Sequence, residues 1–123
     1  MKGILIDVTS QTVTNVTFNE KDTLNEWYNF VAVNSRMVEV AMELPNEDGI
    51  TGNSIMVDEE GLLYLTTDSK FFTYKGAHQP FAGNGLIVGI NYENGETIDV
   101  SITADDVKNN ITFHNIHEVR NFM

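Results

Sequence analysis

The chain has 123 residues, 41% of them hydrophobic and 10% aromatic, which is enough to bury one core and too short for two. Its formal net charge of -11 argues against direct binding to the phosphate backbone of a nucleic acid. The absence of Cys excludes disulfides, thiolate metal sites and cysteine nucleophiles. We therefore expect a single domain over residues 1–123.

No segment of the sequence resembles a membrane anchor or an export signal. The apolar runs fall far short of the roughly 20 residues that a membrane-spanning helix needs. Residues 1–7 hold one Lys and three consecutive large apolar residues before an Asp, without the apolar core and cleavage site of a secretory signal. We expect a cytoplasmic protein with no membrane partner.

Two short segments at the start of the chain predict an antiparallel hairpin. Residues 3–8 form an apolar run, and residues 13–18 place Val16 and Phe18 at alternate positions. The polar residues between the two segments are typical of a turn.

A helix is predicted next, over residues 23–32. Thr23 and Glu26 have the spacing of a capping box, in which the two side chains accept from free amides at a helix start. One apolar stripe at helical spacing consists of Leu24, Trp27, Tyr28 and Val31. We expect Trp27 in the core rather than stacked on a ligand.

Alternating apolar residues then predict a strand that ends at Pro45. Val38, Val40, Met42 and Leu44 are expected on the buried face, with Glu39 and Glu43 among the exposed residues. Residues 54–65 contain two further apolar halves, residues 55–57 and 62–65. The acidic residues Asp58, Glu59 and Glu60 separate them and indicate a tight turn or a bulge.

Residues 71–74 and 86–90 are predicted to be interior strands. Asn94-Gly95 indicates a hairpin with a type I′ turn, because both residues tolerate a positive φ. A two-residue turn would pair Gly89 with Val100. It would also set Glu93 against Glu96, and this like-charge pair favours a longer loop.

Thr103 and Asp106 form a second capping box, which predicts a short helix over residues 104–111. Residues 112–123 have apolar residues at roughly helical spacing and could continue the helix, form a strand or cover a partner. The tail ends in Phe122 and Met123, and two large apolar residues there favour a homo-oligomer. Short turns dominate the chain, so we expect an α+β fold: one small domain with a mainly antiparallel sheet of five to seven strands and two helices.

The window from Ser69 to Tyr92 contains no carboxylate, and Lys70 and Lys75 are its only charged residues. A candidate ligand site for a phosphate or carboxylate is therefore placed in this window, partly because glycines can present backbone amides to an anion. Its residues are Lys70, Lys75, His78, Gln79, Gly83, Asn84 and Gly85. The alternative is a packed loop followed by a buried strand, from which acids are excluded by desolvation.

No catalytic residue and no cofactor can be assigned from the sequence. His78 has no visible nucleophile or carboxylate partner in a motif. Asp58, Glu59 and Glu60 are candidates for contact with a partner, or form a solvated turn. His114, His117 and Glu118 would share a metal only in a helix, where a defined third ligand is still missing, so we assign no metal site.

The string Val57-Asp58-Glu59-Glu60-Gly61-Leu62 follows a predicted strand, helix and strand. Together with residues 82–89, Ala-Gly-Asn-Gly-Leu-Ile-Val-Gly, it resembles a family of small uncharacterised proteins of phages and mobile elements. The resemblance covers about residues 1–90, and its motifs are turn and core residues. It implies a phage-type accessory protein, and some proteins of this kind look like inhibitors of bacterial defence. It carries over no catalytic residue.

Two hypotheses about function follow. The first is a non-enzymatic protein that binds and interferes with a host protein through an acidic or apolar surface, in the cytoplasm of a bacterial host. The alternative is a small-ligand binder or sponge for a nucleotide-like anion that uses residues 70–85. An enzyme is the less favoured class.

Overall fold

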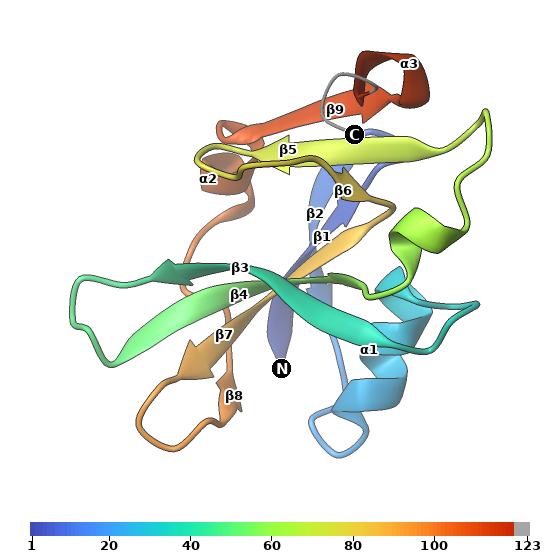
Figure 1. The fold of residues 1–123 in the computed structure, drawn as a ribbon. Coiled ribbons are helices and arrows are strands. Elements are labelled where there is room, and N and C mark those ends of the chain that lie inside the picture. Colours follow the sequence, from blue (N-terminus) through green and yellow to red (C-terminus); the bar gives the residue numbers. More distant parts are fainter. Residues whose placement is uncertain (120–123) are drawn as a thin grey trace.

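The computed structural model describes residues 1–119, and the residues at the end of the chain that favoured a homo-oligomer, Phe122 and Met123, lie outside it. In this part of the chain, two antiparallel sheets and three short α-helices form the fold (Figure 1). The strands are β1 (Lys2–Asp7), β2 (Thr12–Thr17), β3 (Val38–Pro45), β4 (Thr51–Asp58), β5 (Lys70–Tyr74), β6 (Phe81–Ala82), β7 (Gly85–Asn91), β8 (Thr97–Ile98) and β9 (Ile111–Asn115). The helices are α1 (Thr23–Val31), the 3₁₀-helix η1 (Gly61–Leu63), α2 (Ala104–Lys108) and α3 (Ile116–Val119).

The larger sheet has six strands in the order β2-β1-β7-β4-β3, with β8 paired to β7, and the smaller has the order β6-β5-β9. All strand pairs are antiparallel, which confirms the predicted α+β class with a mainly antiparallel sheet. The described residues hold more elements than predicted, because residues 111–119 form a strand and a third helix.

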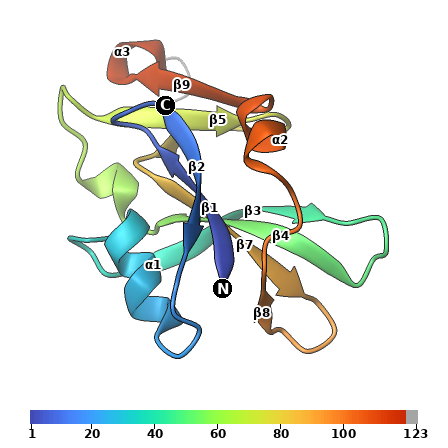
Figure 2. The same cartoon turned by 180° about the vertical axis from the view of Figure 1, so that it is seen from behind.

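The two faces of the larger sheet bury different partners, because successive residues of a strand point to opposite faces. On one face Ile4, Ile55 and Ile87 pack with Phe72 of the smaller sheet and Val107 of α2. Residues on the other face belong to a second cluster: Phe18, Val31, Ala32, Met56, Leu86 and Val88. Figure 2 shows the consequence, with α1 and α2 on opposite sides of the β1–β2 hairpin.

The predicted N-terminal hairpin is confirmed, with Ile4 opposite Asn15. The helix over residues 23–31 is confirmed too, but its predicted cap is wrong. Asp22 is the N-cap and makes no side-chain capping bond, whereas Thr23 is the first helical residue. Trp27 is partly buried, packs against the second cluster and meets Phe18 edge-on, with ring centroids 6.1 Å apart, whereas Leu24 of the predicted stripe is 49% exposed.

The predicted strand at residues 38–44 is confirmed, but its alternation is not. A register shift between Val40 and Met42 moves Val40 to the exposed side, because a bulge inserts one unpaired residue. The tight turn predicted at Asp58, Glu59 and Glu60 is present, because β4 ends at Asp58 and the next two residues form a turn. The apolar half that follows begins in η1 and is not a strand.

The hairpin after β7 is confirmed with a different register. Gly89 pairs with Ile98 rather than with Val100. Gly95 has a φ of +74°, and Asn94 is not among the residues with positive φ, so the turn is not type I′. The loop is longer, as the Glu93 and Glu96 charges favoured. The second capping box is confirmed at Thr103 and Asp106, but α2 ends at Lys108.

Candidate functional site

The candidate site is the segment Asp58–Tyr64, which we call the acidic–apolar segment. It begins where β4 ends, and the Asp58 carboxylate stops the strand by accepting from the Glu60 amide at 2.8 Å and the Ser35 hydroxyl at 2.6 Å. The Leu63 amide then donates to the Glu60 carbonyl at 2.9 Å, which closes the turn of η1. The sequence folds this way because a short acidic side chain can satisfy amides that a continuing strand would have paired.

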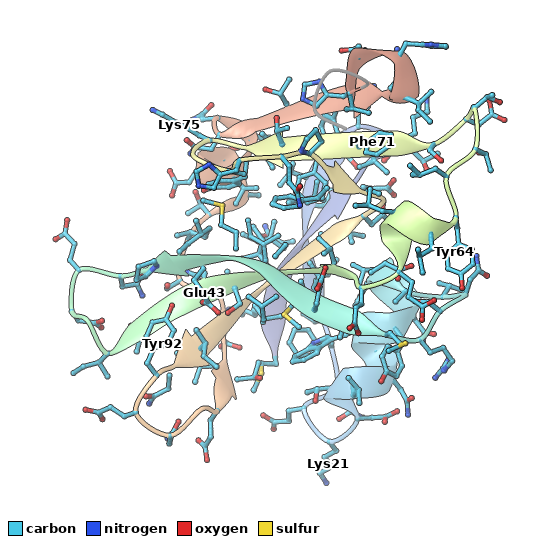
Figure 3. All side chains as sticks on the ribbon, in the orientation of Figure 1. Lys21, Glu43, Tyr64, Phe71, Lys75 and Tyr92 are labelled. Atoms are coloured by element: carbon cyan, nitrogen blue, oxygen red, sulfur yellow. The ribbon has the colours of Figure 1, made fainter. Side chains whose placement is uncertain are left out.

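Three consecutive large side chains of this segment face solvent. The exposed fractions are 53% for Leu62, 73% for Leu63 and 59% for Tyr64. Figure 3 shows Tyr64 at the outer side of the molecule beside η1. Carboxylates border the three residues: Glu59 is exposed, and Glu60 accepts a hydrogen bond from the Tyr64 hydroxyl at 2.9 Å. This bond to a carboxylate raises the pKa of Tyr64 and holds its ring at the edge of the segment.

A cavity of about 370 Å³ opens beside Tyr64. Its walls come from five parts of the chain: the β1–β2 turn, the end of α1 and the residues after it, the end of β4 with η1, residues 64–70, and the end of β6 with the two residues that precede β7. It brings together Asp58 from one predicted site and Lys70, Gly83 and Asn84 from the other. The volume lies in the range that small-molecule sites occupy.

The charges in this cavity do not favour an anion. Asp58 and Asp68 line it together with Lys70, which is the one cationic residue that residues 1–119 contribute to its walls. The backbone amide of Gly83 already donates to the Lys70 carbonyl at 3.0 Å, so it cannot join a set of amides around a ligand. A phosphate here would meet two carboxylates for one ammonium group.

Asn84 holds the cavity together instead of facing a ligand with free polar atoms. Its Oδ1 accepts from the Val8 amide at 3.0 Å, and its Nδ2 donates to the Phe30 carbonyl at 3.4 Å. The side chain therefore ties the β1–β2 turn to α1. Gly85 is a packing residue, since a Cβ there would stand 2.7 Å from the Phe72 ring.

The remaining predicted ligand residues lie elsewhere. Lys75 follows β5 at the end opposite to Lys70, roughly 16 Å away by the rise of a strand. Figure 3 shows Lys75 and Tyr64 on opposite sides of the molecule. His78 is exposed, and Gln79 lines a separate cavity of about 60 Å³ that it shares with Glu59 and Leu62. The structure therefore does not bring the two lysines together.

The His residues near the end of the described chain make local contacts. His114 lies on β9, where its Nε2 is 3.0 Å from the Thr73 hydroxyl and its Nδ1 is 3.5 Å from Glu118. His117 lies on α3. Within residues 1–119, no group of three His, Asp or Glu side chains could hold a metal ion. No helix in the same range is long and apolar enough to cross a membrane.

The sequence analysis missed the exposed role of Leu62, Leu63 and Tyr64, which it described only as an apolar half after the acidic turn. One signal could have found them. Glu60 and Tyr64 have the i, i+4 spacing of a helical pair, and their side chains form that pair in the structure.

Comparisons of the chain with protein-family models, with characterised proteins and with solved structures give no match. The resemblance to phage and mobile-element proteins therefore stays a prediction.

Proposed function

We propose that this protein acts by binding another protein through the acidic–apolar segment, and that its partner is a host protein with which it interferes. The observation that carries the proposal is the exposure of Leu62, Leu63 and Tyr64 beside the carboxylates of Glu59 and Glu60. The resemblance to phage accessory proteins supports the choice of a bacterial host, and of its cytoplasm as the compartment.

The energetics favour a protein interface at this place. Burying a large apolar side chain contributes about 1.5–3 kcal/mol, so the three exposed residues of the acidic–apolar segment offer several kcal/mol to a partner. An aromatic ring next to aliphatic side chains is typical of the residues that dominate binding energy. The surrounding carboxylates, on a chain of net charge -11, would speed association with a basic partner and exclude acidic ones.

The test compares one change in the segment with the same change elsewhere. Leu63→Asp removes the most exposed apolar contact, whereas Leu24→Asp makes the same change on α1, where the side chain is 49% exposed. Proteins retained by each variant from the host cells would be identified by mass spectrometry, and affinities measured with the purified partner. We expect Leu63→Asp to lower the affinity for the partner at least tenfold, and Leu24→Asp to leave it unchanged.

The charge component has its own variant. Glu59→Lys reverses a charge without removing a hydrogen bond that holds the turn, whereas Asp58 must stay because it accepts from the Glu60 amide. We expect slower association and a weaker dependence on salt. Equal binding by all the variants, or a partner whose activity the wild-type protein leaves unchanged, would refute the proposal.

A small-ligand binder is the second candidate, and the 370 Å³ cavity favours it. Of the residues predicted for a nucleotide-like anion, Lys70, Gly83 and Asn84 line this cavity, and its two carboxylates argue against such a ligand. Native mass spectrometry of the protein purified from its host decides the matter. A bound molecule that adds mass to the wild type and is absent from Lys70→Ala would support a ligand site. A wild-type mass equal to that of the chain alone would contradict one.

A further inference from the structure

β2 forms an open edge of the larger sheet. The strand order places β1 on one side of it and no described strand on the other. Pairing with β1 runs without a break from Thr12 to Thr17. The edge of a sheet exposes unpaired N–H and C=O groups, and these are a template for a further strand.

The hydrogen bonds show which groups of β2 point outward. The Phe18 amide donates to the Met1 carbonyl at 2.9 Å, and in an antiparallel pair every second residue bonds to its partner. Counting back from Phe18, the residues of β2 that bond to β1 are Val16, Thr14 and Thr12. The residues between them are Val13, Asn15 and Thr17, so the amides and carbonyls of these three face away from β1. No backbone hydrogen bond from residues 1–119 reaches these outward groups.

β2 also lacks the sequence devices that normally protect an edge. It contains no charged residue, no Pro and no bulge in its register. The opposite edge strand, β3, has a register shift after Val40, carries Glu39 and Glu43, and ends at Pro45. Charges, prolines and bulges on an edge prevent pairing with another chain. One edge of this sheet is therefore blocked, and the other is suited to pairing.

We propose that two copies of this chain pair through β2, antiparallel to each other, with Asn15 on the two-fold axis. This register sets Val13 opposite Thr17 of the second copy and uses all three outward residues. It forms roughly six hydrogen bonds, two for each residue pair. The pairing is isologous and leaves the two blocked β3 strands as the outer edges of the combined larger sheet, so this sheet closes at a dimer.

The shape of the surface beside β2 fits this register. α2 covers one end of the strand, since Val107 packs in the same cluster as Val13. A cleft of about 520 Å³ lies at the other end, between residues 15–17 and residues 100–104. Because the register sets Val13 opposite Thr17 of the other copy, the α2 of each copy comes next to the cleft of its partner.

The charge of the chain acts against this contact and gives it a signature. Two copies of net charge -11 repel each other, whereas the paired strands themselves are uncharged. Salt screens that repulsion, with a Debye length of about 8 Å at 0.15 M and about 3 Å at 1 M. The dimer should therefore become tighter as salt increases, whereas binding of a basic partner to the acidic–apolar segment should become weaker.

Single Cys substitutions test the register, because the chain contains no other Cys. Across the two-fold axis the Cα atoms at position 15 should lie about 5.5 Å apart, within the range that a disulfide bridges. Asn15→Cys should therefore form a disulfide-linked dimer under mild oxidation. Thr12→Cys is the matched control on the same strand, since position 12 faces position 18 of the other copy, far from its own equivalent.

Sedimentation equilibrium of the wild type should give a mass between one and two chains of 13.8 kDa, rising with concentration and with salt.

Asn15→Pro removes an outward amide and leaves the bonds to β1, and Asn15→Asp places two carboxylates together; both should weaken the dimer at least tenfold. A monomer mass throughout, or equal cross-linking of the two Cys variants, would overturn the proposal. Leu63→Asp should leave the dimer intact, so failure of this inference is distinct from failure of the proposed function.

Discussion

Several polar side chains in this protein each join two elements of the fold. Asn84 bonds both the β1–β2 turn and the last turn of α1. Asn53, which is fully buried, exchanges hydrogen bonds with Ser101 and so attaches β4 to the segment that leads into α2. Glu43 of β3 accepts from Ser54 of the neighbouring β4 and from Tyr92, which follows β7, and Figure 3 shows Glu43 close to Tyr92. Removing one such group leaves its buried partners unsatisfied, which costs more than the bond itself contributes.

Trp27 gives a residue-scale prediction, because its ring packs well while its Nε1 is buried without a hydrogen-bond partner among the described residues. Trp27→Ala should lower the free energy of unfolding by roughly 3 kcal/mol through the cavity it leaves. Trp27→Phe keeps most of the packing and removes the unpaired donor, so it should cost under about 1 kcal/mol. Urea unfolding followed by circular dichroism measures both. Equal costs for the two variants would show that the ring does not pack against Phe18.

Tyr74 gives a prediction about pH. Burial raises its pKa, and the nearby Asp106 carboxylate adds to the effect. The folded protein therefore holds this proton more strongly than the unfolded chain does. The resulting stability is complete below the unfolded-state pKa of about 10 and is lost as the pH rises above it.

The check is urea unfolding at pH 7 and at about pH 10.5, for the wild type and for Tyr74→Phe. The stability of the wild type should fall between the two pH values, and Tyr74→Phe should fall less. An equal decline in both proteins would assign the loss of stability at high pH to other groups. The first of these to test is Tyr92, whose pKa is also raised by burial.

At the scale of elements, two identical signals in the sequence have different outcomes. Both Thr23 and Thr103 are followed three residues later by an acid, yet only Thr103 is an N-cap, with the Asp106 amide donating to its hydroxyl at 3.1 Å. Thr103→Ala should therefore lower the free energy of unfolding by about 1 kcal/mol, and Thr23→Ala by under about 0.5. Thermal unfolding of both variants measures the difference. A larger cost for Thr23→Ala would place the true cap at that residue.

The sequence predicted most elements, and it failed where a distant contact overrides a local pattern. The apolar residues were sufficient to locate β1, β2, α1, β5 and β7, each of which contributes buried residues to the two clusters. The sequence failed at β3, where a bulge changes the phase of alternation after Val40. It predicted the turn at Asp58, Glu59 and Glu60 but not η1, which begins after the Asp58 carboxylate has satisfied the Glu60 amide.

At the scale of the whole molecule, the candidate site depended on pairings that no local pattern contains. Lys70 and Lys75 are close in sequence, but β5 directs them to opposite ends of the smaller sheet. Asp58 and Lys70 belonged to separate predicted sites and line one cavity. The sequence therefore identified several of the right residues, and only the strand order could group them.

The net charge of the molecule gives a prediction at the same scale. A chain of net charge -11 repels itself when compact, so NaCl raised from 0.05 to 0.5 M should stabilise the monomer in dilute solution. A gain of about 1 kcal/mol would raise the melting temperature by roughly 4 °C. Near pH 4, where about half the carboxylates are protonated, the effect should shrink. A salt effect of equal size at both pH values would mean that charge repulsion is not its cause.

The central position of β7 has a consequence for synthesis of the chain. β1–β2 and β3–β4 are hairpins between neighbouring segments, but both join the sheet only through β7, which pairs with β1 and with β4. A nascent chain that has not yet released residues 85–91 from the ribosome therefore carries two incomplete hairpins with unpaired edges. Such long-range pairings slow folding, and the exposed edges are the groups that chaperones protect. The larger sheet of this protein can therefore be assembled only after residue 91, about three-quarters of the chain, has been made.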